Sequence, residues 1–182
     1  MAAGTDPVTG RTLQRSVTFR SVTFRGSAVD AAIAVQMVLG LVEPQSSGLG
    51  GGAFLLHHDA KTRRLTAYDG RETAPSAAKP DRFIGPDGKP LPFDTAVVSG
   101  RATGVPGAVK MLGLAQAEHG KLPWSSLFGD AERTADEGFI VSPRLERMIH
   151  ADYAENHQPD VIAYFSKPDG TLLNAGDRLV NK

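Results

Sequence analysis

The sequence contains no cysteine among its 182 residues, which excludes disulfide bonds, thiol nucleophiles and cysteine-ligated metal sites. It has no excess of either charge, because 20 basic residues balance 20 acidic ones. Broad binding to nucleic acids or membrane surfaces needs a basic excess, so the sequence predicts neither kind of partner. The chain also lacks a run of about 18 apolar residues, the length that a membrane-spanning helix requires.

The first residues show no features of an export signal. Residues 1–14 are polar and include glycine, with no apolar core segment. Residues 16–20 and 21–25 repeat the pentapeptide Ser-Val-Thr-Phe-Arg, in which apolar and polar residues alternate as in a half-buried strand. Two copies of five residues are too few for a repeat fold. We therefore define residues 1–25 as an atypical N-terminal segment without an assigned function.

The bulk composition is that of a globular protein. Hydrophobic residues make up 41% of the chain and charged residues 22%, both near the averages of folded domains. A length of 182 residues suits one domain of ordinary size or a part of a larger one. The local patterns predict a layered α/β fold that is mostly helical and contains one short β-hairpin.

A helix is predicted over residues 27–39. Ser27 caps its start, and Asp30, three residues later, answers it as in a capping box. The body of the helix is apolar nearly all round, so we expect it to be buried on more than one side, packed on a sheet, with Met37 in the core. Gly40 is expected to end the helix.

The remaining elements are short. Five prolines within residues 75–96 predict an irregular surface excursion, and Trp124 and Phe128, four residues apart, predict one apolar patch. The expected elements are strands at 53–57 and 64–68 around a turn at 59–62, helices at 106–119, from Pro123 to about Gly138 and from Ser142-Pro143 onward, and a turn at 167–170. Wide apolar helix faces need a covering sheet. We therefore expect a sheet that is incomplete here, completed by another chain or by sequence beyond Lys182.

The histidines and polar motifs give no sign of a cofactor. His57 and His58 are adjacent, so on a strand they face opposite sides and cannot chelate one metal ion together. We interpret them as structural or surface histidines. The sequence shows no metal, nucleotide or flavin motif, and we expect no cofactor.

The strongest candidate site combines a glycine-rich loop with one arginine. Residues 44–52 hold four glycines in the five positions from Gly48 to Gly52, and Arg71 follows the second predicted strand, within a motif that runs to Pro75. Glycine lets backbone or ligand approach closely. Guanidinium stays charged at any usable pH and grips a carboxylate with two parallel hydrogen bonds. Together they predict a site for a small anion such as a carboxylate.

Each of the two signals also has an ordinary structural interpretation. A glycine cluster most often forms a turn or a tight strand crossing. A single arginine after a strand is most often a solvated surface cation. Neither signal by itself supports a function.

Several short motifs follow one another along the chain. They are Gly26-Ser27-Ala28-Val29-Asp30-Ala31-Ala32, residues 43–52, Asp69-Gly70-Arg71-Glu72-Thr73-Ala74-Pro75, Gly104-Val105-Pro106-Gly107, Gly120-Lys121-Leu122-Pro123-Trp124, Glu137-Gly138-Phe139 and Val141-Ser142-Pro143. Together they resemble one protein family, the γ-glutamyltranspeptidases, in the N-terminal region of their large subunit. The likeness runs in order from about Gly26 to Lys182. We therefore assign residues 26–182 to that region, as an incomplete domain.

The resemblance implies a partial αββα sandwich of the N-terminal-nucleophile hydrolases. In that family the precursor cleaves itself, and the new N-terminal threonine of the small subunit attacks the γ-glutamyl amide of glutathione or a similar compound. The γ-glutamyl group then passes to water, an amino acid or a peptide. The resemblance gives Arg71 the task of binding the α-carboxylate of the γ-glutamyl group. It also implies the small-subunit portion of the same precursor as a partner, and a periplasmic or extracellular location.

The chain also departs from the family pattern. By the resemblance we expect the threonine nucleophile and the small-subunit site residues beyond Lys182, an export signal that residues 1–14 do not show, and a helix-forming segment where the repeat at 16–25 stands. We therefore expect the chain alone to be inactive, with Arg71 as its substrate-binding residue and no catalytic residue. Two alternatives stay open: a related acylase acting on β-lactam side chains or poly-γ-glutamate, and a non-catalytic fragment or binding chain.

Overall fold

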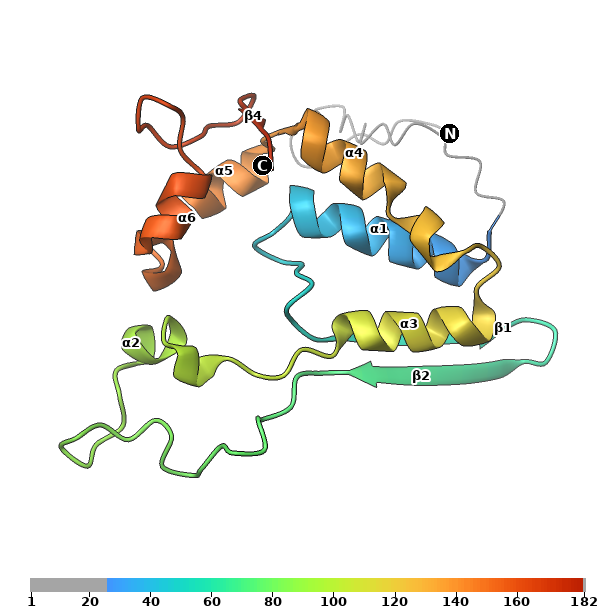
Figure 1. The fold of residues 1–182 in the computed structure, drawn as a ribbon, viewed down its shortest axis with the longest axis horizontal. Coiled ribbons are helices and arrows are strands. Elements are labelled where there is room, and N and C mark those ends of the chain that lie inside the picture. The colour runs from blue at the N-terminus through green and yellow to red at the C-terminus, as the bar shows by residue number, and fades with distance from the viewer. Residues whose placement is uncertain (1–25, 182) are drawn as a thin grey trace, which may run out of the picture.

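The computed structural model describes residues 26–181, so the predicted segment at 1–25 lies outside the described residues. Its longer sheet is an antiparallel hairpin of β1 (Ala53–Asp59) and β2 (Arg64–Gly70), with Ala53 opposite Gly70. Both strands run two residues longer than predicted. Helix α3 (Ala108–His119) lies along this hairpin, and α1 (Ala28–Val42) packs against α3 and against α4 (Gly129–Glu137) (Figure 1). We expected the helix at 27–39, which is now α1, to pack on the sheet. Helix α3 covers the hairpin instead, and α1 packs mainly against α3 and α4.

The capping box at the start of α1 is confirmed. The Ser27 hydroxyl accepts from the backbone N–H of Asp30 (3.2 Å), and the Asp30 carboxylate accepts from the backbone N–H of Ser27 (2.7 Å). The predicted stop at Gly40 is wrong, because α1 continues to Val42. A helical glycine costs only about 1 kcal/mol relative to alanine. Partial burial of Leu41 and Val42 offsets that cost.

The helices after the Pro-rich excursion differ from the prediction in detail. Helix α3 begins two residues after Pro106, because Gly107 occupies the capping position. The helix expected from Pro123 is two pieces, a 3-10 helix (Trp124–Leu127) and α4. The rings of Trp124 and Phe128 meet edge to face at 5.1 Å, which confirms the predicted patch. Gly138, at φ 76°, ends α4 as predicted.

The main core lies between α1, the hairpin, α3 and the 3-10 helix at 124–127. Its buried members are Val29, Ile33, Met37, Tyr68, Met111, Leu112, Ala115 and Leu127. Met37 is 4% exposed, as predicted for a core residue. Apolar side chains from four elements thus share one interior, which fixes the hairpin against α3.

Polar and aromatic side chains also link the middle of the hairpin to the C-terminal end of α3. The Tyr68 hydroxyl donates to the Glu118 carboxylate (2.5 Å) and lies 2.7 Å from the imidazole of His119. Burial and the Glu118 carboxylate raise the pKa of Tyr68 to about 12. His57 stacks on His119 at 3.8 Å while His58 is exposed, so the two adjacent histidines face opposite sides as predicted. His57 is therefore a packing residue.

A second, smaller core gathers the C-terminal elements. It contains Val141, Leu145, Ile149, Leu173 and Leu179. These come from α5 (Pro143–Ile149) and from the segments around β3 (Phe139–Ile140) and β4 (Arg178–Leu179), two antiparallel strands of two residues each. Helix α5 and its Ser142 cap confirm the prediction, and the turn at 167–170 is present. The sequence did not predict β3, β4 or α6 (Pro159–Tyr164).

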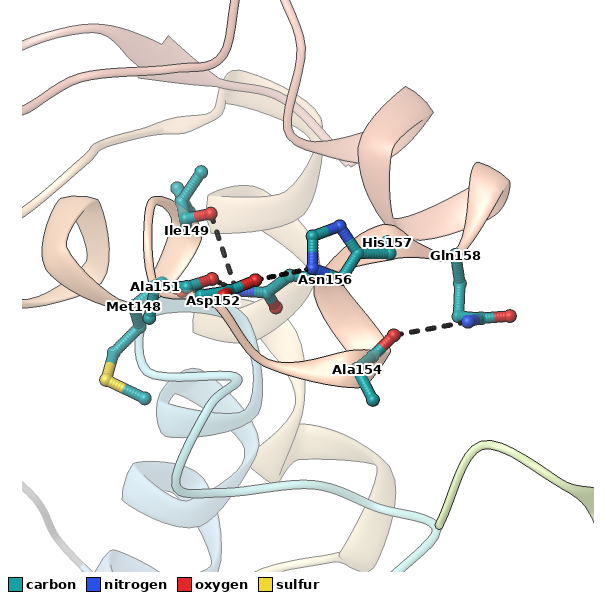
Figure 2. Close-up of polar contacts among 8 residues, drawn as sticks. All are labelled: Met148, Ile149, Ala151, Asp152, Ala154, Asn156, His157 and Gln158. Atoms are coloured by element: carbon teal, nitrogen blue, oxygen red, sulfur yellow. Dashed lines mark hydrogen bonds and ion pairs between the residues drawn. The ribbon is translucent and has the colours of Figure 1, made fainter. Parts of the chain in front are cut away.

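One asparagine joins α5 to the 3-10 helix at Ala154–His157. The Asn156 side-chain amide donates to the carbonyls of Met148 (2.7 Å) and Ala151 (2.8 Å) and lies 3.4 Å from that of Ile149 (Figure 2). These carbonyls stand at the end of α5, where backbone acceptors lack helical partners. Asn156 thus satisfies the open end of the helix with its side chain.

Residues 71–107 form the long connection between β2 and α3, which extends away from the helices (Figure 1). The predicted irregular path is observed, except that it ends in two short helices, α2 (Phe93–Val97) and a 3-10 helix (Gly100–Ala102). Residues 26–181 thus form a mixed helical and strand structure without a closed sheet. None of the helices in this range has the length and apolar character needed to cross a membrane.

Candidate functional site

Arg71 stands directly after β2, at the point where the chain leaves the hairpin. Its backbone N–H donates to the Asp69 carboxylate (2.9 Å), which fixes the turn out of the strand. Its guanidinium lies 3.3 Å from the Glu72 carboxylate, and the side chain is 60% exposed. The arginine is thus held on a rigid strand end, while its charged group stays accessible to a ligand.

The glycine-rich loop packs directly behind Arg71. A Cβ on Gly52 would stand 2.8 Å from the Arg71 Cα and 2.5 Å from a Glu72 carboxylate oxygen, so only glycine fits there. The Gly51 carbonyl accepts from the backbone N–H groups of Gly107 (3.3 Å) and Ala108 (3.2 Å), at the start of α3. The structure therefore brings the two sequence signals together, and the loop serves close packing around the arginine.

A third segment, residues 104–107, completes this packing. The backbones of Thr73 and Val105 exchange two hydrogen bonds (3.2 and 2.8 Å). A Cβ on Gly107 would stand 2.5 Å from the Gly70 carbonyl oxygen and 3.0 Å from that of Arg71. The sequence showed this segment only as part of the family likeness. Its glycine lets α3 start against the strand end that carries Arg71.

Replacing Gly107 by alanine is expected to lower the free energy of unfolding by about 1–3 kcal/mol, because the new methyl group meets backbone atoms that cannot turn aside. Gly113→Ala in the middle of α3 is the matched control. No atom lies within 4 Å of its added Cβ, so a helical alanine should stabilise by about 1 kcal/mol. Thermal unfolding of both variants checks the pair. Equal shifts of the two melting temperatures would contradict the packing argument.

Glu72 is a site residue that the sequence did not single out beyond its motif. A backbone hydrogen bond from its own N–H lowers the pKa of the Glu72 carboxyl, and the positive charge of Arg71 adds to this, against the opposing effect of burial. The carboxylate therefore stays ionised at neutral pH beside the guanidinium. An ionised partner directs the guanidinium without occupying all five of its N–H groups.

Arg71 and Glu72 line an open cleft of about 770 Å³. Its walls come from the strand end, the Pro-rich excursion and the segment before α3, and they include Gly50, Thr73, Lys79, Arg82, Phe83, Arg101 and Gly104. A volume of this size suits a small-molecule ligand. The three additional cations could not be predicted from the sequence, because Lys79 and Arg82 lie in an irregular segment and Arg101 in a short 3-10 helix, both without a recognisable motif. Residues 26–181 contain no cluster of three or more histidine, aspartate or glutamate side chains placed to hold a metal ion.

Comparison with known proteins identifies the family of this chain. The sequence profile described as gamma-glutamyltranspeptidase matches residues 22–182. The chain belongs to the gamma-glutamyltranspeptidase family. The glutathione hydrolase proenzyme of Bacillus subtilis (strain 168) is 38% identical over 157 residues, which cover 86% of this chain and 27% of that protein. The chain described here thus spans about a quarter of the length of the curated relatives it matches.

Solved structures of a gamma-glutamyltranspeptidase and of a cephalosporin acylase share the fold. Helicobacter pylori gamma-glutamyltranspeptidase superposes with a TM-score of 0.77 at 30% identity, over 86% of this chain and 44% of that one. The cephalosporin acylase from Bacillus halodurans superposes with a TM-score of 0.70 at 27% identity, over 85% of this chain and 29% of that one. Most of this chain therefore shares the fold of a part of each of these larger proteins.

Proposed function

We propose that this chain is the N-terminal part of the large subunit of a γ-glutamyltransferase that also hydrolyses glutathione. In this proposal Arg71 binds the α-carboxylate of the γ-glutamyl group. The small-subunit portion of the same precursor supplies an N-terminal threonine, whose hydroxyl attacks the γ-glutamyl amide carbonyl while the terminal amine takes up its proton. The amide C–N bond breaks, the amine leaves with that proton, and the γ-glutamyl group remains as an ester on the threonine. Water, an amino acid or a peptide then attacks the ester, takes the γ-glutamyl group and returns the proton to the threonine hydroxyl. This chain contributes binding and no catalytic residue.

The observation that carries the proposal is the placement of Arg71. The arginine follows a strand, is packed from behind by Gly52 and Gly107, and presents an accessible guanidinium to a cleft. Such a fixed fork matches the geometry of a free carboxylate. Membership of the family and the proenzyme relative in Bacillus subtilis support a self-processed precursor with two subunits. A periplasmic or extracellular location is proposed on the family likeness alone.

The test is expression of the full-length precursor that contains this chain. We expect denaturing mass spectrometry to find two subunits, the smaller beginning with threonine, and we expect the pair to release glutamate from glutathione. An uncleaved precursor, or a processed pair that does not cleave γ-glutamyl amides, would contradict the proposal. Separation of compartments in the source cells, followed by immunoblotting, tests the location.

A second candidate function is that of a related acylase. The superposition on a cephalosporin acylase favours it, because 85% of this chain shares that enzyme's fold at a TM-score of 0.70. The two functions differ in the donor, since Arg71 in its full motif suits a free α-carboxylate and therefore γ-glutamyl compounds. A panel of γ-glutamyl amides, poly-γ-glutamate and acylated β-lactams separates them. Preferential cleavage of a β-lactam side chain would decide for the acylase.

A further inference from the structure

The cleft beside Arg71 carries more positive charge than one carboxylate needs. Four cations line it, namely Arg71, Lys79, Arg82 and Arg101, while Glu72 is the acidic residue of its wall. The chain as a whole has no net charge. The positive charge is thus gathered at this cleft, where the cations together attract an anion.

Arg82 and Arg101 are held in place by neutral backbone groups. Arg82 donates from one terminal nitrogen toward the carbonyls of Gly100 (3.3 Å) and Thr103 (3.5 Å). Arg101 donates from one terminal nitrogen to the carbonyl of Arg82 (3.1 Å) and toward that of Ile84 (3.5 Å). These bonds cross-link the two walls of the cleft. They leave the other N–H groups of each guanidinium available, and a carbonyl does not cancel the charge.

Four lysine and arginine side chains of the described residues have carboxylate partners. The pairs are Arg71 with Glu72, Arg133 with Asp130, Arg144 with Glu43, and Lys167 with Asp177. Within residues 26–181, the structure gives no ion pair for Lys79, Arg82 or Arg101. A guanidinium that is anchored by one nitrogen and lacks a counter-ion is prepared to receive an anion.

We propose that Arg82 and Arg101, with Lys79 at the rim, form a subsite for a second carboxylate of the γ-glutamyl donor. This inference rests on the proposed function, in which Arg71 already holds the α-carboxylate of the γ-glutamyl group. The subsite would select donors whose remainder is itself acidic, as in peptides with a free C-terminal carboxylate. It would disfavour otherwise identical donors that end in a neutral amide.

The test compares glutathione with glutathione whose C-terminal carboxylate is converted to a carboxamide. In the processed full-length enzyme we expect kcat/KM to be about tenfold higher for glutathione, because a charged hydrogen-bonded contact discriminates by about this factor. Arg101→Gln and Arg82→Gln should reduce this preference to about twofold or less. Lys79→Gln removes charge without removing any backbone cross-link, and we expect it to reduce the preference by about half.

The controls separate the possible failures. Arg147→Gln, an exposed arginine on α5 away from the cleft, should keep the full preference. An effect on folding alone would lower kcat/KM for both donors equally and leave their ratio unchanged, which overturns the subsite. A wild-type enzyme without preference also overturns it. Failure to cleave either donor would instead contradict the proposed function.

Discussion

Replacing Asp30 by alanine is expected to lower the free energy of unfolding by about 2–4 kcal/mol, since backbone donors lose their acceptor in a buried place. The Asp30 side chain is 0% exposed. Besides the cap bonds from Ser27, its carboxylate accepts from the backbone N–H groups of Lys121 (2.9 Å) and Leu122 (3.3 Å), which lie about ninety residues further along the chain. One carboxylate thus joins the start of α1 to the loop after α3.

Thermal or denaturant unfolding measures this loss. Asp136→Ala is the matched control, because Asp136 is an exposed aspartate on α4, and we expect it to cause no loss of stability. Ser27→Ala should cost less than Asp30→Ala, because it removes a single cap acceptor, worth about 1 kcal/mol. Equal effects of the Ser27 and Asp30 variants would mean that the long-range bonds add nothing.

The same carboxylate predicts a dependence of stability on pH. Burial alone would raise the pKa of Asp30, but the hydrogen bonds from Ser27, Lys121 and Leu122 outweigh it and lower the pKa below its ordinary value. The ionised form is then favoured in the folded state. Its contribution is fully present above the unfolded pKa of about 4 and is lost as the pH falls through the folded pKa. Asp30→Asn should flatten this acid limb of the melting temperature, and an unchanged limb would contradict the assignment.

Asp30 also shows which contacts of this fold can be predicted from the sequence and which cannot. The capping box could be predicted, because a serine followed three residues later by an acidic residue is a local pattern. The bonds to Lys121 and Leu122 could not, since no periodicity links positions so far apart. The extension of α1 past Gly40 could not be predicted either, because it depends on tertiary packing. That packing outweighed the weak local preference of glycine against a helix.

Some residues of the candidate site could likewise be predicted from the sequence, and others could not. Arg71 and the glycine loop were predicted from their motifs, and the structure places them in contact. Arg82 and Arg101 were missed, because they lie in a Pro-rich path and a 3-10 turn, and only the folded chain brings them to one cleft. The short strands β3 and β4 were missed because two residues give no alternating pattern to detect.

Replacing Arg71 by alanine in the complete enzyme is expected to raise KM for γ-glutamyl donors by about 30-fold or more, the equivalent of about 2 kcal/mol at the low end for a lost carboxylate contact. The structure gives two reasons. The guanidinium that grips the carboxylate is removed, and Glu72, ionised beside it, is left facing the donor's negative charge. Steady-state kinetics with a γ-glutamyl anilide measures the change.

Arg71→Lys separates geometry from charge. Lysine keeps the positive charge near Glu72 but cannot form two parallel bonds to one carboxylate, so KM should stay well above the wild-type value while falling below that of Arg71→Ala. Arg63→Ala, at the opposite end of the hairpin in its turn, is the matched control and should leave KM unchanged. A wild-type KM in Arg71→Ala would remove this residue from the site. Equal KM values for Arg71→Lys and the wild-type enzyme would mean that a positive charge at this strand end is enough to bind the donor. The two parallel hydrogen bonds of the guanidinium would then not be needed.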